Sequence, residues 1–236
     1  MNKQPAALWA VVPAAGVGSR MQASVPKQYL PLHGRSVIEC SLQRLAGLPA
    51  IRGIVVALAA DDRWWPDLQL KLDIPLLTVV GGEQRCDSVL NALELLSHTA
   101  AGADWVMVHD AARPCVQRAD LEKLYQRVTQ IGQGGLLAVP VCDTMKRADG
   151  KHRQVTETVE RNDLWHALTP QIFRLDELQR ALSTALAEGQ QVTDEASAME
   201  HAGYQPLLVE GHHDNIKITH PDDLALAEYY LDNQGK

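Results

Sequence analysis

Short apolar runs rich in Val, Ile and Leu recur along the chain, without the polar alternation that marks a half-exposed strand. Continuous runs of this length are typical of strands buried on both faces of a parallel sheet. The pattern predicts strands over residues 8–12, 54–59, 76–80, 105–108, 136–141 and 206–209.

Segments with a helical repeat lie between these runs. Apolar residues recur at helical spacing over 85–97 and again over 175–188, where Gly189 marks the helix end. A last helix is expected with Thr219 as its cap, Pro221 in its first turn and Asp222 three residues after the cap. Strands and helices in alternation predict an α/β fold with an open, mainly parallel sheet, which binds ligands at the carboxyl ends of its strands.

The segment from Cys142 to Asp163 breaks this rhythm, because it is largely polar and charged. Asp149 and Gly150 at its centre form a dipeptide that favours a type I′ hairpin turn, since both residues tolerate positive φ. The flanking residues carry little apolar surface with which to fold onto a core. We therefore expect a projecting β-hairpin arm over 142–163 inside a single domain that spans 1–236.

Composition and charge narrow the classes of function. The chain has 236 residues, of which 46% are hydrophobic and 22% charged, enough for one core but not for two comfortable domains. Its formal net charge of -7 argues against binding to nucleic acid or to an anionic membrane through a general basic field. Any chemistry on phosphate must then depend on a few locally placed cations.

The expected location is the cytoplasm. The N-terminal apolar run breaks at Pro13, too early for a secretion signal, and no apolar stretch approaches the roughly 20 residues that span a bilayer. The four cysteines are far apart and form no Cys-x-x-Cys pair, which disfavours a disulfide framework or a zinc site. His212 and His213 stand beside Asp214 without further ligands at a usual spacing, so we expect no metal site there.

Small residues follow the first predicted strand. Ala14, Ala15, Gly16 and Gly18 allow the backbone to approach a ligand and to offer its N–H groups to phosphate oxygens. The loop is not a dinucleotide fingerprint, because Met21 stands at the third glycine position, and no Gly-Lys-Ser/Thr of a P-loop follows. When this loop is considered alone, a tight strand-to-helix turn explains it as well as a phosphate-binding loop does.

Two cations, Arg20 and Lys27, come soon after the loop. A nucleoside triphosphate carries about four negative charges near neutral pH, so a transition state built on it needs cations placed in advance. Both residues are close enough in sequence to surround one triphosphate. The alternative is that both are solvated surface charges, the usual state of Lys and Arg.

At this point the sequence resembles a known family. VVPAAGVGSRM followed by PKQYL is similar to the nucleotidyltransferase motif of the 2-C-methyl-D-erythritol 4-phosphate cytidylyltransferases. Further blocks match that family in order over essentially the whole chain: GGEQRCDSV, VHDAARP, PVCDTMKR, RNDLWHALTPQ, TDEASAME, DNIKIT and PDDLALAE. The resemblance implies a single Rossmann-like nucleotidyltransferase domain that transfers a cytidylyl group from CTP to 2-C-methyl-D-erythritol 4-phosphate.

The resemblance also implies a nucleotide site. The matching positions, which hold the triphosphate or complete the pocket for cytidine, are Pro13, Ala14, Ala15, Gly16, Gly18, Gly82, Glu83, Ser88, Asp110 and Ala111. Glu83 departs from the pattern, since we expect Asp there in close relatives. A backbone contact would tolerate this change, whereas a carboxylate contact would be altered by the longer side chain.

Other matching positions imply the second substrate and the catalytic cations. The substrate-binding set is Asp110, Arg113, Thr144, Arg161, Thr169 and Thr193, and the catalytic set is Arg20, Lys27 and Lys217. Arg113 would face the substrate phosphate, Arg161 suits bidentate contact with it, and Lys217 would lie on the α-phosphate. Because Asp110 and Arg113 are three residues apart, the alternative for both is a mutual ion pair.

The chemistry needs no general base, and no pair of carboxylate and histidine stands out as one. The nucleophile is already an ionised phosphate oxygen, so attack on the α-phosphate requires no prior loss of a proton. Mg²⁺, held mainly by the triphosphate and not by protein ligands, would add charge neutralisation. The resemblance further implies a homodimer whose arms reach across to the neighbouring active site.

Two other functions remain open at this level. One is a different nucleotidyltransferase acting on a sugar or polyol phosphate, because a small-residue loop with two cations is generic to phosphate handling. The other is a regulatory protein that binds a nucleotide without turnover. Arg113, Thr144, Arg161 and Thr169 argue against regulation alone, since they are polar residues expected at a second substrate.

Overall fold

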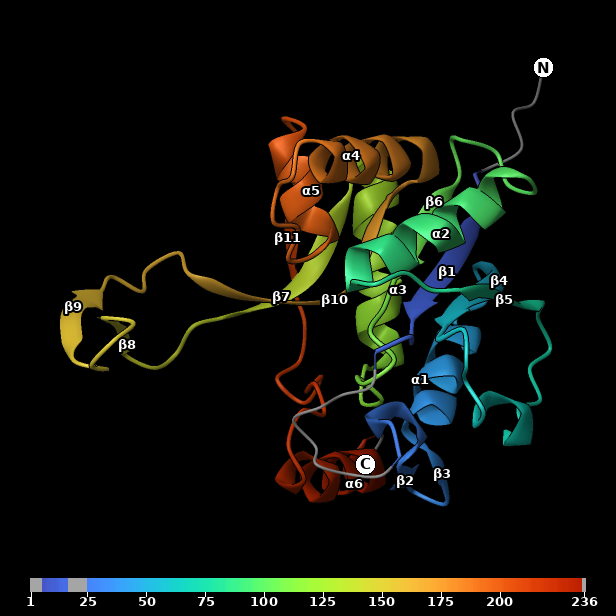
Figure 1. Cartoon of the computed structure of the whole chain (residues 1–236), viewed down its shortest axis with the longest axis horizontal. Helices are drawn as coiled ribbons and strands as arrows, with labels where there is room; N and C mark the ends of the chain where they lie inside the picture. Colours follow the sequence, from blue (N-terminus) through green and yellow to red (C-terminus); the bar gives the residue numbers. More distant parts are fainter. Residues whose placement is uncertain (1–5, 17–24, 235–236) are drawn as a thin grey trace.

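A computed structural model describes residues 6–16 and 25–234, so the expected site residues Gly18 and Arg20 lie outside the described residues. Seven strands form one sheet in the order β11-β7-β10-β6-β1-β4-β5 (Figure 1). They are β1 (Leu8–Pro13), β4 (Ile51–Leu58), β5 (Leu76–Val80), β6 (Trp105–Val108), β7 (Gly135–Pro140), β10 (Trp165–Arg174) and β11 (Leu207–Glu210). Of these seven described strands, only β10 is antiparallel to its neighbours, so the predicted α/β fold with a mainly parallel sheet is confirmed.

Helices cover both faces of the sheet. They are α1 (Val37–Ala46), α2 (Arg85–Ser97), α3 (Arg118–Ile131), α4 (Leu175–Ala187) and α5 (Glu195–His201), while α6 (Asp222–Asn233) lies beside the short strand β2 (Pro31–Leu32). Ala10 and Val12 of β1 join the core formed with α1 and α3, whereas Val11 joins the core formed with α2, α4 and α5. Burial on both faces is the reason that these central strands are continuous apolar runs.

The six predicted strands are present within a few residues of their expected bounds. Burial on both faces is wrong for β5 and for β11, because these are the two edge strands of the sheet, and Val80 and Leu208 are 57% and 49% exposed. The apolar pattern also misses β10, which lies between β6 and β7. His166, Thr169 and Gln171 interrupt its apolar run, and its register with β7 shifts between Ala167 and Gln171.

The two helices predicted from periodicity are confirmed as α2 and α4, and Gly189 after α4 has a φ of 69°. The pattern leaves α1 and α3 unassigned. Thr219 as the cap of the last helix is wrong, because Pro221 is the N-cap residue and makes no side-chain cap. Instead the Asp223 carboxylate, inside the helix, accepts a hydrogen bond from the Thr219 backbone N–H at 2.7 Å.

The expected arm is a hairpin of β8 (Met145–Ala148) and β9 (Val155–Val159) that projects from the body of the molecule (Figure 1). The type I′ turn is wrong: a longer loop runs from Asp149 to Gln154, closed by a 3.0 Å hydrogen bond between their backbones, and Arg153 has the positive φ. No side chain between residues 142 and 163, all of which the structure describes, is buried. The hairpin therefore has no core of its own.

Candidate active site

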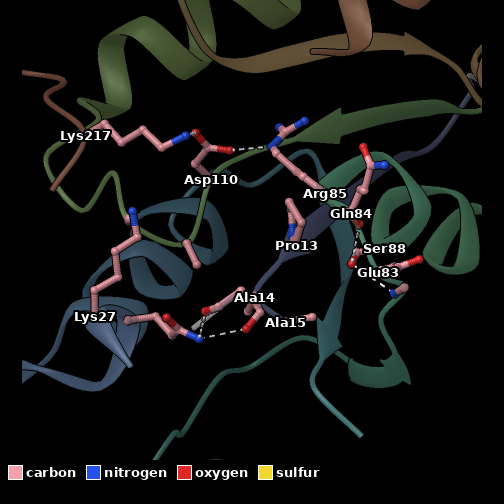
Figure 2. A pocket seen from close by; sticks show the side chains of 15 residues that line it. Pro13, Ala14, Ala15, Lys27, Glu83, Gln84, Arg85, Ser88, Asp110 and Lys217 are labelled. Carbon is pink, nitrogen blue, oxygen red and sulfur yellow. Dashed lines mark hydrogen bonds and ion pairs between the residues drawn. The ribbon is translucent and has the colours of Figure 1, made fainter. Parts of the chain in front are cut away.

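A cavity of about 250 Å³ opens at the carboxyl ends of β1 and β6, beside the first turn of α2 (Figure 2). An α/β sheet binds ligands at this edge, because the loops that follow its parallel strands meet there. The expected site residues that line it are Pro13, Ala14, Ala15, Gly16, Lys27, Gly82, Glu83, Ser88, Asp110, Ala111 and Lys217. The fold thus brings together segments from both ends of the chain.

The small-residue loop after β1 is held by a buried amide. Gln28, only 4% exposed, donates from Nε2 to the carbonyl of Ala14 at 2.8 Å and to that of Gly16 at 3.1 Å. The Ala14 N–H in turn donates to the Ala57 carbonyl at the end of β4. These bonds fix the loop between the sheet and the 3-10 turn η2 (Lys27–Tyr29).

A second loop, before α2, forms the opposite wall of the cavity. A Cβ atom on Gly82 would lie 2.2 Å from the Cβ of Asp87, so the close approach requires glycine. The Ser88 hydroxyl accepts a hydrogen bond from the Gly82 N–H and donates to the Gln84 carbonyl, both at 3.1 Å. Asp87 accepts from the Gln84 N–H at 2.8 Å, which caps α2 and completes the wall.

Lys27 lies on η2, which is held from two sides. Its Nζ donates to the Ile218 carbonyl at 3.0 Å. On the far side, the Tyr29 hydroxyl donates to the Asp62 carboxylate at 2.6 Å, and Trp64 stacks on the Tyr29 ring. Burial and the neighbouring Asp62 raise the pKa of Tyr29 well above its ordinary value, so the phenol stays protonated and keeps this bond.

Asp110 is the buried acidic centre of the site. Its Oδ1 accepts from Arg85 Nε at 2.9 Å, and its Oδ2 lies 2.8 Å from Lys217 Nζ and 3.7 Å from Arg113 Nε. Burial alone would raise the pKa of Asp110, but the charges of Arg85, Lys217 and Arg113 outweigh it and hold that pKa well below its ordinary value. Asp110 is therefore ionised throughout the physiological pH range.

Arg85 continues this network beyond the cavity. Its Nη1 and Nη2 donate to the two carboxylate oxygens of Glu195 on α5, at 2.6 and 3.1 Å. Burial would lower the pKa of Arg85, but the carboxylates of Glu195 and Asp110 together raise it above its ordinary value. The guanidinium is thus a permanent cation between two carboxylates.

Arg113 is a neighbour of Asp110 but does not line the cavity. The residue is 9% exposed, and Nη1 donates to the Asn215 carbonyl at 2.6 Å. Burial lowers the pKa of Arg113, while the nearby Asp110 partly restores it. The ion pair with Asp110, the structural alternative for these two residues, is present, and contact of Arg113 with a substrate phosphate stays a prediction.

Thr169 is also buried, at 5% exposure, and supports the loop of Asp110. Its hydroxyl accepts from the Asp110 N–H at 3.0 Å and lies 3.1 Å from His109 Nδ1. Because His109 Nε2 lies 3.0 Å from the Arg113 carbonyl, Nε2 carries the proton and Nδ1 accepts from Thr169. Burial lowers the pKa of His109 to about 4, so the ring is neutral.

Comparison with known proteins decides the family. A sequence model of the 2-C-methyl-D-erythritol 4-phosphate cytidylyltransferases matches residues 8–233. The chain belongs to this family. It is 51% identical over 234 residues to the family member of Vibrio vulnificus, covering 99% of this chain and 98% of that one. It is 53% identical over 219 residues to the Pseudomonas putida relative, covering 92% and 93%.

A solved structure agrees with the sequence comparison. The crystal structure of the Francisella tularensis 2-C-methyl-D-erythritol 4-phosphate cytidylyltransferase has a TM-score of 0.83 and 36% identity to this chain, covering 95% of it and 100% of that chain. The chain is therefore a cytidylyltransferase, a class of nucleotidyltransferase, and the resemblance predicted from the ordered sequence blocks is confirmed.

Three residues expected to bind the second substrate of a cytidylyltransferase lie away from the cavity. Thr144 and Arg161 are exposed residues of the arm, and Arg161 donates to the carbonyl of Cys142. Thr193 is exposed just before α5, where its N–H donates to the Ser197 hydroxyl at 3.2 Å. These three residues do not line the cavity that the described part of the same chain forms.

Glu83, the departure from the family pattern, lines the cavity and is exposed. Among the described residues its carboxylate has no hydrogen bond or ion pair. Both the side chain and the backbone of Glu83 are therefore available at the cavity, and contact of either with the base stays a prediction.

Three residues escape the sequence analysis, namely Gln28, Arg85 and Glu195. Arg85 and Glu195 lie inside the blocks GGEQRCDSV and TDEASAME, so a charged residue in a family block was the available signal. Gln28 lies inside the block PKQYL, but its side chain is uncharged and its role depends on carbonyls of the loop that folds over it.

The adjacent histidines lie elsewhere on the molecule. His212 directs Nδ1 to the Asp120 carboxylate of α3 at 2.9 Å. Within residues 6–16 and 25–234, no group of three or more His, Cys, Asp and Glu side chains is placed to hold a metal ion. In the same ranges, no helix has the length and apolar character needed to cross a membrane.

Proposed function

We propose that this cavity is the site at which the chain transfers a cytidylyl group from CTP to 2-C-methyl-D-erythritol 4-phosphate. The products are 4-diphosphocytidyl-2-C-methyl-D-erythritol and pyrophosphate, on the route to isoprenoid precursors. Family membership supports both substrates. The observation that carries the proposal is the convergence of Lys27, Arg85 and Lys217 on one cavity beside the small-residue loop. In a chain of net charge -7, these cations form a local site of the kind that a triphosphate requires.

The nucleotide contacts follow from the two walls of the cavity. The loop after β1 would offer backbone N–H groups to the triphosphate, with Arg20 and Lys27 as its cations. The loop residues proposed to contact the triphosphate are Pro13, Ala14, Ala15, Gly16 and Gly18. The residues proposed to contact the cytidine are Gly82, Glu83, Ser88, Asp110 and Ala111. Lys217 would lie at the α-phosphate.

The proposed reaction is an in-line displacement at the α-phosphorus. An ionised phosphate oxygen of the second substrate forms the new P–O bond as the bond to the bridging oxygen breaks, and the electron pair leaves with pyrophosphate. Lys27 and Lys217 neutralise the charge that grows on the phosphate oxygens. No residue needs to accept a proton, and His109, which is neutral and bonded within the chain, is not required as a base.

Mg²⁺ is the proposed cofactor. In proteins Mg²⁺ usually binds through one or two carboxylates together with substrate phosphates. Asp110 is a buried carboxylate that lines the cavity, and both its oxygens are paired with cations, so triphosphate oxygens would supply most of the ligands. Bound Mg²⁺ acts as a Lewis acid that stabilises charge on the phosphates.

The arm is proposed to complete the site of a second copy in a homodimer. Thr144 and Arg161 are expected at the second substrate, together with Arg113, Thr169 and Thr193. Thr144 and Arg161 nevertheless do not line the cavity of their own chain. An isolated two-stranded hairpin is marginal in water, and this one exposes apolar side chains such as Val155 at 61%. A symmetric dimer that exchanges arms would bury them and deliver Arg161 to the neighbouring cavity.

A cytoplasmic location, without a membrane or nucleic-acid partner, is proposed as well. Cys40, Cys86, Cys115 and Cys142 are free thiols, a state typical of reducing compartments. The acidic net charge of -7 opposes attachment to nucleic acid or to anionic lipid.

The test is a pyrophosphate-release assay on the purified chain. We expect release with CTP, Mg²⁺ and 2-C-methyl-D-erythritol 4-phosphate together, and none when any of the three is left out. Parallel reactions pair UTP with a hexose phosphate. Activity in these would favour another nucleotidyltransferase, while CTP binding without release of pyrophosphate would favour a regulatory role.

A further inference from the structure

Glu195 is a buried carboxylate that the proposed reaction does not use. It is 1% exposed and does not line the cavity, so it cannot touch a substrate. Both of its oxygens accept hydrogen bonds from the guanidinium of Arg85, at 2.6 and 3.1 Å. A buried ion pair of this kind seldom stabilises a fold more than well-packed apolar side chains would. Stability alone therefore does not account for the pair, and its other effect is to orient the Arg85 guanidinium.

The position of Glu195 is fixed by the start of α5. The Asp194 carboxylate caps the helix by accepting from the Ser197 N–H at 2.9 Å. Gln171 of β10, itself 1% exposed, accepts from the Ala196 N–H at 2.7 Å and donates to Asp194 at 2.9 Å. Glu195 thus projects from a point that is bonded on both sides to the central sheet.

Glu195 restricts how Arg85 can meet Asp110. A guanidinium has a fork of donors that matches both oxygens of one carboxylate, and Glu195 occupies the Nη1 and Nη2 side of that fork. Only Nε of Arg85 reaches Asp110, at Oδ1. Oδ2 of Asp110 is therefore left to Lys217 Nζ at 2.8 Å, with Arg113 Nε farther away at 3.7 Å.

Figure 2 shows Lys217, Asp110 and Arg85 in one row at the edge of the cavity. Lys217 is 38% exposed, and a lysine on a flexible four-carbon stem needs a fixed anion to hold its ammonium group in place. Without Glu195, the fork of Arg85 would be free to pair with both oxygens of Asp110 and to displace Lys217.

We propose that Glu195 is a positioning residue of the transferase, which acts through Arg85 and Asp110 to hold Lys217 at the reacting phosphate. The inference rests on the proposed function, because it assumes that Lys217 acts on the α-phosphate. It adds a residue outside the cavity, on α5, to the machinery of the site.

The test is Glu195→Gln, which keeps the shape of the side chain and removes its charge. We expect kcat at saturating substrates to fall on the order of ten-fold or more, because small displacements of a reacting group are costly, with a much smaller change in the CTP Kd measured by calorimetry. Glu200→Gln on the exposed face of the same helix is the matched control and should retain full activity. If CTP affinity and thermal stability fell together with kcat, Glu195 would have a structural role only.

Combining Glu195→Gln with Arg85→Met tests the route of the effect. If Glu195 acts only through Arg85, the double variant should be no slower than Arg85→Met alone. Wild-type kcat in Glu195→Gln would overturn the proposal, and so would losses of kcat that multiply in the double variant. The proposal would also be overturned if both Glu195→Gln and Arg85→Lys failed to fold. A wild-type chain that releases no pyrophosphate would instead refute the proposed function, so the two failures are distinguishable.

Discussion

Lys217 and Asp110 form an ion pair, with 2.8 Å between Nζ and Oδ2, that joins the segment after β11 to the loop after β6. These strands are neighbours neither in sequence nor in the sheet. The next carbonyl of the same segment, that of Ile218, accepts the hydrogen bond of Lys27 Nζ at 3.0 Å. One short segment therefore sets the positions of two lysines relative to the buried carboxylate.

Replacing either lysine should slow the chemical step more than it weakens CTP binding. We expect Lys27→Met and Lys217→Met, and equally Arg20→Met, to lower kcat on the order of 100-fold or more, because the charge that each cation faces grows in the transition state. Single-turnover rates and CTP calorimetry measure the two effects. Lys71→Met, at an exposed position outside the cavity, is the control. Near-wild-type turnover at saturating substrates would show that the assigned role is wrong.

Gln28→Glu should disturb the small-residue loop. The introduced carboxylate would face the Ala14 and Gly16 carbonyls, which now accept from the amide, and two acceptors without a proton between them repel. We expect a rise in the KM for CTP on the order of ten-fold and a loss of stability of about 1–3 kcal/mol. Gln69→Glu adds the same charge at an exposed site and should change neither value. A Gln28→Glu chain with unchanged KM for CTP would exclude this role of the amide.

Acid should destabilise the fold through His109. Burial holds its pKa at about 4, below the 6.5 expected in the unfolded chain, so the unfolded state binds the extra proton in that window. The stability that comes from the neutral ring is complete above pH 6.5 and is lost as the pH falls toward 4, by about 3 kcal/mol in all. Denaturant unfolding between pH 4 and 7 measures this slope.

The comparison for that slope is His109→Gln, which cannot titrate. We expect its free energy of unfolding, whatever its absolute value, to change less with pH than that of the wild type. His213→Gln, at an exposed position, should keep the wild-type slope. Parallel slopes for wild type and His109→Gln would remove His109 as the source.

Mixing two inactive variants tests whether the arm completes the neighbouring site. Lys27→Met damages the cavity and Arg161→Ala damages the arm, so one site of each mixed dimer collects both defects while the other is wholly wild type. With random exchange of subunits, about a quarter of all sites should recover activity. Pyrophosphate release before and after mixing measures the recovery.

Subunit exchange must be verified independently, for example with two affinity tags. If both residues serve the same chain, every site carries a defect and no activity returns. That result would refute the shared site and leave the cytidylyltransferase assignment intact.

The sequence by itself determined the class of fold and most of the cavity. Strands such as β1 and β6 could be identified because burial on both faces leaves a continuous apolar run. The residues after β1, before α2 and after β6, with Lys217, could be assigned because their local motifs occur in a fixed order along the chain. Each of these signals is contained in a few consecutive residues.

Only the tertiary structure decided which groups meet. The sequence did not reveal the antiparallel strand β10, because its polar residues Thr169 and Gln171 are buried by bonds to Asp110 and to α5. Nor did it reveal that Glu195 holds Arg85. A hydrogen bond between residues far apart in the chain leaves no periodic pattern in the sequence. The sequence also does not distinguish a charged residue that is buried from one that is exposed to solvent. The partner that stabilises its charge exists only once the chain has folded.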